Sequence, residues 1–146
     1  MAATGQLASA ISPLLKTGDV LALRGSIGAG KTTFARALIR SLGGKEEVPS
    51  PTFNLLYIYE LNALTIWHFD LFRVDTLADV YELGVEDALE TAVSLVEWPE
   101  VMTPLIPHEH LEIEFSYRAD QCRKVSIQGY GTWPQRLGTL KSLVYE

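Results

Sequence analysis

Cysteine is nearly absent from this sequence: one residue among 146, Cys122, is a cysteine, so no disulfide can form within the chain. A lone thiol fits a reducing compartment, and we expect the protein to be cytoplasmic. Also missing is any run of about 20 apolar residues, the length that a membrane-spanning helix needs. The first residues contain no basic segment followed by an apolar core, so we expect no signal peptide. Together these absences predict a globular protein without membrane association.

An excess of basic charge is missing as well. Twelve Lys and Arg residues are outnumbered by 18 Asp and Glu, which gives a formal net charge of −6. Proteins that bind the phosphate backbone of nucleic acids without a partner usually carry a basic patch or stripe, whereas the basic residues of this chain are scattered. We therefore expect no DNA binding and no autonomous binding of RNA. The length suits one domain spanning residues 1–146.

Short apolar runs and longer periodic stretches alternate along the chain, and this alternation predicts an α/β fold. The period-two and uniformly apolar segments predict strands at 20–23, 53–61, 64–71, 94–97, 111–117 and 125–130. Apolar residues at helical spacing predict helices at 7–15, 31–42 and 80–90. Segments 53–61 and 64–71 are expected to pair as an antiparallel hairpin, and so are the last two strands.

The two ends of the chain are also expected to be helical. Thr4 is a candidate cap for the first helix. Pro134 suits the first turn of a closing helix. That helix would bury Leu137, Leu140 and Val144.

A glycine-rich loop lies between the first strand and the second helix. The stretch Gly25-Ser-Ile-Gly-Ala-Gly-Lys-Thr32 matches the pattern G-x-x-x-x-G-K-[ST] without a gap. The glycines let the backbone turn tightly and point its N–H groups at phosphate oxygens, and the helix that begins at Lys31 directs its positive end to the same place. Lys31 supplies a charge for the β and γ phosphates, and the Thr32 hydroxyl can ligate Mg²⁺.

This loop in its strand–helix context predicts that a nucleotide docks its phosphates at Gly25 to Thr33, with Mg²⁺ beside them. The fold expected around it is a P-loop NTPase-like, three-layer α/β fold with a mixed parallel and antiparallel central sheet. The chain contains no Asn-Lys-x-Asp segment of the kind that reads guanine, which favours ATP over GTP.

A phosphate loop of this kind needs a second acidic group to hold the metal or its water. Asp70 is the first candidate, because it closes the predicted strand that contains Ile66 and His68. Glu97 is the second, because it ends another apolar strand. Ligands of open α/β sheets bind at strand ends, which favours both acids. The alternative for each is an ordinary strand-end cap or a salt-bridge partner, and the pattern leaves open which acid contacts Mg²⁺ and which positions water.

Three further features have two interpretations each. Thr52, in Ser50-Pro-Thr-Phe53, belongs either to a plain loop–strand junction or to a switch-type loop that senses the γ-phosphate. Arg73 either neutralises phosphate charge or pairs with Asp70. Trp98 either lines the nucleotide site or a partner surface, or it is a core residue.

A histidine pair occurs late in the chain. His108 and His110 lack a third metal ligand, so we expect no zinc site there. The nearby acids Glu109, Glu112 and Glu114 are expected to form a solvated strand face.

Four segments, taken in order, resemble the bacterial TsaE family of tRNA threonylcarbamoyladenosine (t6A) biosynthesis. They are Gly25-Ser-Ile-Gly-Ala-Gly-Lys-Thr-Thr-Phe34, Ser50-Pro-Thr-Phe53, His68-Phe-Asp-Leu-Phe-Arg73 and Leu95-Val-Glu-Trp-Pro99. The phosphate loop is shared with many families, whereas the other three segments together are much more specific. The likeness extends over nearly the whole chain. One departure is Ser26, where the family usually has an acidic residue, and this puts any catalytic or docking role of that acid in doubt.

The resemblance implies a small P-loop ATPase with weak intrinsic activity that uses ATP and Mg²⁺. Thr32 and Glu97 would hold the magnesium, with Asp70 needed for hydrolysis and therefore kept among the metal-site candidates. Catalysis is assigned to Asp70, Glu97 and Lys31. The residues expected to contact the nucleotide are Thr4, Gly25, Ser26, Ile27, Gly28, Ala29, Gly30, Lys31, Thr32, Thr33, Thr52 and Trp98.

The resemblance also implies a partner, the TsaB–TsaD protein complex. ATP turnover would reset that complex between rounds of threonylcarbamoyl transfer to adenine 37 of tRNA, so the chain would meet tRNA only indirectly. One alternative is a small-molecule kinase, but between Arg73 and Arg118 the chain has no basic residue that could form an arginine lid. Another is a scaffold that binds ATP and partners without hydrolysis.

Overall fold

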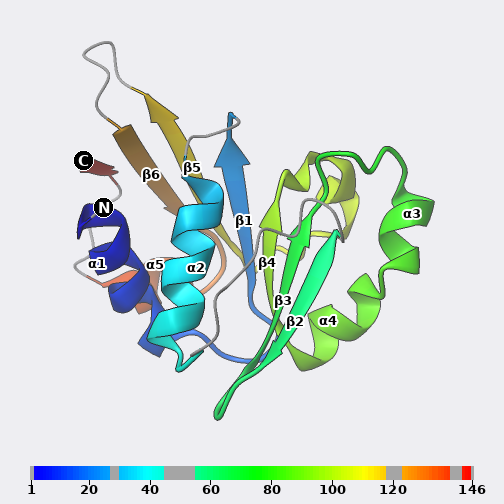
Figure 1. Ribbon diagram of the computed structural model, residues 1–146, viewed down its shortest axis with the longest axis horizontal. Coiled ribbons are helices and arrows are strands. Elements are labelled where there is room, and N and C mark those ends of the chain that lie inside the picture. Colours follow the sequence, from blue (N-terminus) through cyan, green and yellow to red (C-terminus); the bar gives the residue numbers. More distant parts are fainter. Residues whose placement is uncertain (1, 27–29, 45–54, 118–122, 139–142, 146) are drawn as a thin grey trace.

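The computed structural model describes residues 2–26, 30–44, 55–117, 123–138 and 143–145. Within these ranges seven strands form one sheet in the order β2-β3-β4-β1-β5-β6-β7 (Figure 1). The strands are β1 Val20–Gly25, β2 Leu56–Glu60, β3 Thr65–Asp70, β4 Val93–Glu97, β5 Leu111–Tyr117, β6 Arg123–Gly129 and β7 Leu143–Tyr145. The α-helices are α1 Ala2–Ile11, α2 Lys31–Ser41, α3 Leu77–Glu82, α4 Val85–Thr91 and α5 Trp133–Leu137, and two 3-10 helices are η1 Ser12–Leu14 and η2 Pro99–Leu105.

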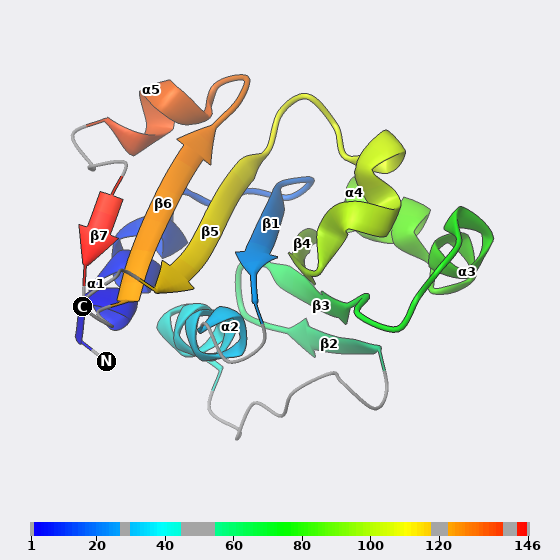
Figure 2. The same ribbon diagram turned by 90° about the horizontal axis from the view of Figure 1, so that it is seen from above.

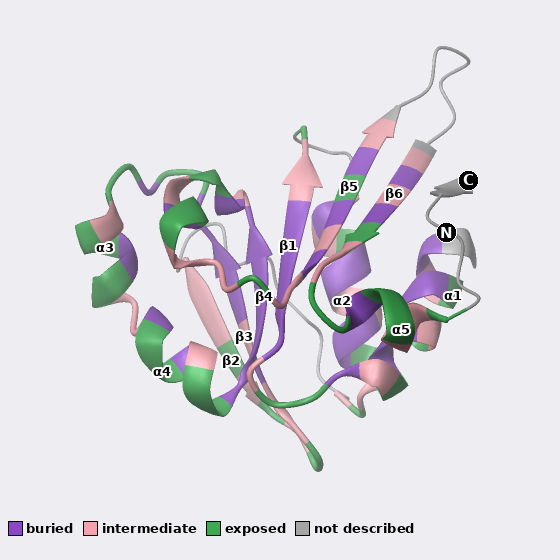
Figure 3. Cartoon of the chain, turned by 180° about the vertical axis from the view of Figure 1, so that it is seen from behind, coloured by how far each residue is buried: buried purple, intermediate pink, exposed green. Residues whose placement is uncertain are grey.

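Strand direction confirms the predicted mixed sheet. The four central strands β3, β4, β1 and β5 run parallel to one another. The flanking pairs β2–β3, β5–β6 and β6–β7 are antiparallel. Because β1 and β4 lie inside the sheet and are covered on both faces, their residues are apolar almost throughout, and Figure 3 shows both strands buried along most of their length.

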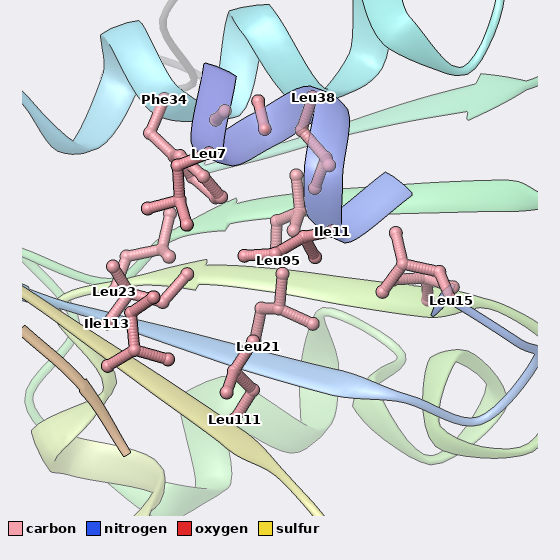
Figure 4. Packing of buried hydrophobic residues seen from close by; sticks show 14 of the residues in the cluster. Leu7, Ile11, Leu15, Leu21, Leu23, Phe34, Leu38, Leu95, Leu111 and Ile113 are labelled. Atoms are coloured by element: carbon pink, nitrogen blue, oxygen red, sulfur yellow. The ribbon is translucent and has the colours of Figure 1, made fainter. Parts of the chain in front are cut away.

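Helices cover both faces of the sheet, which gives the expected three layers (Figure 2). On one face α1 and α2 pack on alternate residues of the parallel strands, and Figure 4 shows Leu21, Leu23 and Leu95 reaching towards these two helices. On the other face Phe69 and Val96 pack against Val80 and Val85 of α3 and α4. Along β3 and β4 the residues of the two clusters alternate, because successive side chains point to opposite faces.

The structure corrects three details of the predicted helices. Thr4 does not cap the first helix, since α1 begins at Ala2, where two alanines favour helix, and Thr4 is an interior, buried position. The stretch 80–90 is two helices rather than one, because Gly84 has a φ of 88° and interrupts it. The closing helix ends at Leu137, and Val144 instead lies in β7, paired with Val125 at the open edge of β6. Leu140, like Cys122, lies outside the described residues.

None of the helices described is both long and apolar enough to cross a bilayer.

Candidate nucleotide-binding site

Strand β1 leads into the glycine loop at the carboxyl end of the parallel strands, and α2 begins after this loop. Gly25 has a φ of 138°, and a Cβ at this position would collide with the backbone carbonyl of Phe115 on the neighbouring strand. Gly30 precedes α2 with a φ of 114° and no side-chain cap, so the first N–H groups of the helix are not taken by a capping side chain. Ile27, Gly28 and Ala29 lie outside the described residues, as does Thr52.

Lys31, the first residue of α2, turns its side chain back onto the loop. Its Nζ donates hydrogen bonds to the carbonyl oxygens of Gly25 at 2.6 Å and Ser26 at 2.9 Å. Burial lowers the pKa of Lys31, and the nearby carboxylates of Glu97, Asp70 and Glu100 oppose that shift. The lysine is thus a buried cation held close to three acids at the edge of the sheet.

Thr32 and Glu97 are in direct contact although they are 65 positions apart. The Thr32 hydroxyl is 2.9 Å from Oε1 of Glu97 and 3.1 Å from Oε2. The Glu97 carboxylate is buried, and Nε2 of His68 lies 2.7 Å from its Oε2. Glu97 is therefore held by side chains from α2 and β3, and neither contact is an ordinary surface ion pair.

Asp70 lies level with Glu97, because these two residues are register partners on the parallel strands β3 and β4. Its Oδ1 accepts a hydrogen bond from the backbone N–H of Phe72 at 3.0 Å, which fixes the carboxylate in the turn after the strand. Asp70 thus acts as a strand-end cap in the structure and is at the same time one of the acids close to Lys31. Arg73 lies exposed in the same turn.

Trp98 belongs to this site and not to the core. Its ring is half-buried and lies under the Lys31 ammonium, 4.1 Å from Nζ to the ring centroid. Phe72 also packs on Trp98, with 4.8 Å between the ring centroids. The other residues predicted to contact the nucleotide do not lie together. Ser26 and Thr33 are exposed next to the loop, whereas Thr4 is buried in α1.

Sequence reasoning missed two members of this cluster, His68 as a partner of Glu97 and Phe72 as a partner of Trp98. The alternation of β3 places His68 on the same face as Asp70, two residues earlier, and this spacing was the available signal. No comparable signal exists for Phe72, because it lies in a turn and meets Trp98 only through the fold.

His110, Glu109 and Glu112 each have contacts of their own. Among the described residues no group of three or more His, Cys, Asp or Glu is arranged to hold a metal ion. His110 contacts the Pro107 carbonyl and Oε2 of Glu112. Two of the three acids expected to form a solvated strand face also form ion pairs, Glu112 with Arg24 at 3.0 Å and Glu109, which precedes β5, with Arg136 at 2.9 Å.

Comparison with known proteins decides the family. Residues 1–125 match the family model described as threonylcarbamoyl adenosine biosynthesis protein TsaE. The chain belongs to the TsaE family. The tRNA threonylcarbamoyladenosine biosynthesis protein TsaE of Rickettsia felis is 38% identical over 125 residues, which cover 85% of this chain and 73% of that protein.

More distant TsaE proteins agree with this assignment. The TsaE of Bacillus subtilis is 33% identical over 129 residues, 88% of this chain and 80% of that protein. The crystal structure of Bacillus subtilis YdiB matches the fold with a TM-score of 0.77 at 30% sequence identity, covering 92% of this chain and 83% of that one. The resemblance to the TsaE family and the predicted fold class are therefore confirmed.

Proposed function

We propose that this TsaE-family chain is a regulatory ATPase that binds Mg-ATP, hydrolyses it slowly on its own, and supports t6A formation at adenine 37 of tRNA by acting on a TsaB–TsaD complex. The observation that carries the proposal is the convergence of Lys31, Thr32, Asp70 and Glu97. These residues come from α2, β3 and β4 and meet at one edge of the sheet, next to the glycine loop.

The donor set suits Mg²⁺. The ion prefers oxygen ligands and is usually held by one or two carboxylates together with substrate phosphates. The Thr32 hydroxyl and the Glu97 carboxylate already lie within hydrogen-bond distance of each other, so both oxygens can serve one small cation. Thr32 and Glu97 would hold the metal, and Asp70, beside them, would orient the attacking water. When bound, the metal supplies positive charge that offsets the charge on the phosphates.

The phosphate contacts come from the loop and the start of α2. Lys31 is held among acids by two loop carbonyls, so its ammonium is already next to the place where the phosphates would lie. The N-terminal end of α2 adds backbone N–H groups and the positive end of the helix dipole. These residues bind and orient the nucleotide, and hydrolysis requires Asp70 in addition.

The partner proposal rests on the family and on charge. Relatives of this chain are named for tRNA threonylcarbamoyladenosine biosynthesis. With a net charge of −6, the chain suits action on a protein complex better than direct binding to tRNA.

The decisive experiment measures ATP hydrolysis by the purified chain with and without TsaB–TsaD, alongside t6A formation on tRNA. We expect slow turnover alone, stimulation by the complex, and loss of t6A formation when Lys31→Ala replaces the wild type. Turnover of about 10 s⁻¹ without partners, a typical enzyme value, would contradict a regulatory ATPase. Transfer of labelled phosphate to a nucleoside or sugar would instead indicate a kinase.

A further inference from the structure

His68 is a fully buried polar side chain on β3. It lies on β3 between Ile66 and Asp70 on the same face, and its register partner on β4 is Leu95. Burying an imidazole costs free energy unless its nitrogens are hydrogen-bonded. Among the described residues, the Nδ1 atom of His68 has no hydrogen-bond partner. The buried Nδ1 atom costs free energy, so we expect the role of His68 to lie in the contact that its other nitrogen makes.

The other ring nitrogen has a single, short contact. Nε2 is 2.7 Å from Oε2 of Glu97. A carboxylate oxygen only accepts hydrogen bonds, so the Nε2–H of the ring must donate. The alternative tautomer would place a lone pair against the carboxylate and bury an N–H with nothing to accept it. The polar contact of His68 is therefore directed wholly at one oxygen of Glu97.

The two oxygens of Glu97 are held differently. Oε2 accepts from His68 and, at 3.1 Å, from Thr32. Within the described part of the chain, Oε1 accepts only from Thr32, at 2.9 Å. Asp70 is the register partner of Glu97, whereas His68 lies two residues before Asp70 on β3 and is the register partner of Leu95. The histidine therefore fixes Oε2 of Glu97 and leaves Oε1 available beside the Thr32 hydroxyl.

We propose that His68 is a positioning residue that fixes the orientation of the Glu97 carboxylate, so that Glu97 offers a single oxygen to a divalent cation and discriminates in favour of Mg²⁺. The proposal rests on the proposed Mg-ATP site. Mg²⁺ demands near-ideal octahedral geometry, whereas Ca²⁺ accepts flexible geometry and two-oxygen carboxylate ligation. Holding Oε2 by His68 therefore penalises Ca²⁺ more than Mg²⁺.

Two amide substitutions separate the hydrogen bond from mere packing. The amide nitrogen of glutamine lies as many bonds from Cα as Nε2 of histidine, whereas that of asparagine lies one bond closer. His68→Gln can therefore still donate to Glu97, and His68→Asn cannot reach it. Ser94→Ala is the structural control, because it removes a buried hydroxyl from β4 that has no hydrogen-bond partner in the described part of the chain and takes no part in the contacts of Thr32 and His68 with Glu97.

The readout is metal affinity rather than turnover. A non-hydrolysable ATP analogue is bound to each variant, and Mg²⁺ or Ca²⁺ is titrated calorimetrically after thermal unfolding has shown that the variant is folded. We expect His68→Asn to weaken Mg²⁺ binding about 10- to 100-fold, the usual effect of losing a residue that orients a ligand. Ca²⁺ binding should change much less, and His68→Gln and Ser94→Ala should retain the wild-type preference for Mg²⁺. If His68→Asn does not fold, His68→Leu takes its place as the variant without a donor.

Two results would overturn the proposal while leaving the nucleotide site intact. One is equal loss of Mg²⁺ affinity in His68→Gln and His68→Asn, and the other is an unchanged ratio of Mg²⁺ to Ca²⁺ affinity in the variant without a donor. If the wild-type chain binds the analogue with no dependence on divalent metal, the proposed function fails as well. The wild-type titration therefore distinguishes the two failures.

Discussion

The Lys31 ammonium lies over the face of the Trp98 ring, 4.1 Å from its centroid. The backbone of Trp98 has a φ of 59° and a ψ of 58°, a left-handed conformation that costs a bulky residue on the order of 1–3 kcal/mol. A hydrogen bond from its N–H to the Leu23 carbonyl helps to hold this turn at the end of β4. The strained turn keeps the tryptophan out of the core and places it against Lys31.

Because of this contact, the fluorescence of Trp98 should report the position of the Lys31 ammonium. We expect the phosphates of a bound nucleotide to draw the ammonium away from the ring, because they carry more charge than the loop carbonyls that hold it. Nucleotide binding should then change tryptophan fluorescence, and Trp98→Phe should abolish most of the change. Trp67→Phe is the matched control, since Trp67 packs on the opposite face of the sheet. A full signal in Trp98→Phe would contradict this assignment.

Asp70 offers a way to separate binding from hydrolysis. Asp70→Asn keeps an oxygen that can accept from the Phe72 N–H but removes the negative charge. We expect hydrolysis to fall at least about 100-fold, the usual scale for a group that orients or activates water, while nucleotide affinity stays measurable. Lys31→Ala should weaken both. Asp70→Asn with wild-type hydrolysis and an unchanged unfolding temperature would remove Asp70 from the mechanism.

The position of the candidate site was largely predictable because its residues are contiguous or end apolar strands. Gly25, Lys31 and Thr32 occur in one motif, and Asp70 and Glu97 each close a strand of the parallel core. Their meeting follows from strand direction, since the carboxyl ends of parallel strands share one edge. Register then sets Asp70 level with Glu97, and only the structure shows this pairing.

Features that depend on long-range contacts were not predictable. Apolar spacing alone places Val144 in the last helix, because it does not distinguish a short strand from another helical turn. In the structure Val144 belongs to a strand, because β7 pairs with the open edge of β6. Similarly, Glu109 and Glu112 look like solvated strand charges until Arg136 and Arg24 are brought beside them.

Gly84 explains why one predicted helix is two, and it can be tested. Its φ of 88° suits glycine, and a Cβ there would meet the Trp67 ring at 3.3 Å. We expect Gly84→Ala to lower the free energy of unfolding by about 1–2 kcal/mol, the cost of a left-handed residue with a side chain. Gly5→Ala is the control, because that Cβ meets nothing within 4 Å in α1. It should stabilise the chain by about 0.5–1 kcal/mol, as alanine does within a helix. Urea unfolding of both variants measures the difference, and destabilisation by Gly5→Ala equal to that of Gly84→Ala would refute the explanation.

A second charged cluster joins α5 to the residue that precedes β1. The Arg136 guanidinium donates two parallel hydrogen bonds to the buried Asp19, at 2.7 and 2.8 Å, and a third to Glu109 at 2.9 Å. Thr132 donates to Glu109 through its hydroxyl and its backbone N–H. These Thr132 hydrogen bonds, with help from Arg136, lower the pKa of Glu109 from 4.5 to about 2.

The pKa of Glu109 predicts a particular dependence of stability on pH. Because folding favours its ionised form, Glu109 contributes stability above its unfolded pKa of 4.5 and loses that contribution as the pH falls towards about 2. We compare wild type with Glu109→Gln by urea unfolding at several pH values. The wild type should be the more stable at neutral pH, and the gap should narrow steadily below pH 4.5. Glu86→Gln, at an exposed glutamate of α4, controls for the general effect of removing one negative charge. A gap that stays constant down to the lowest pH, or widens, would show that the Thr132 and Arg136 contacts do not favour the ionised carboxylate.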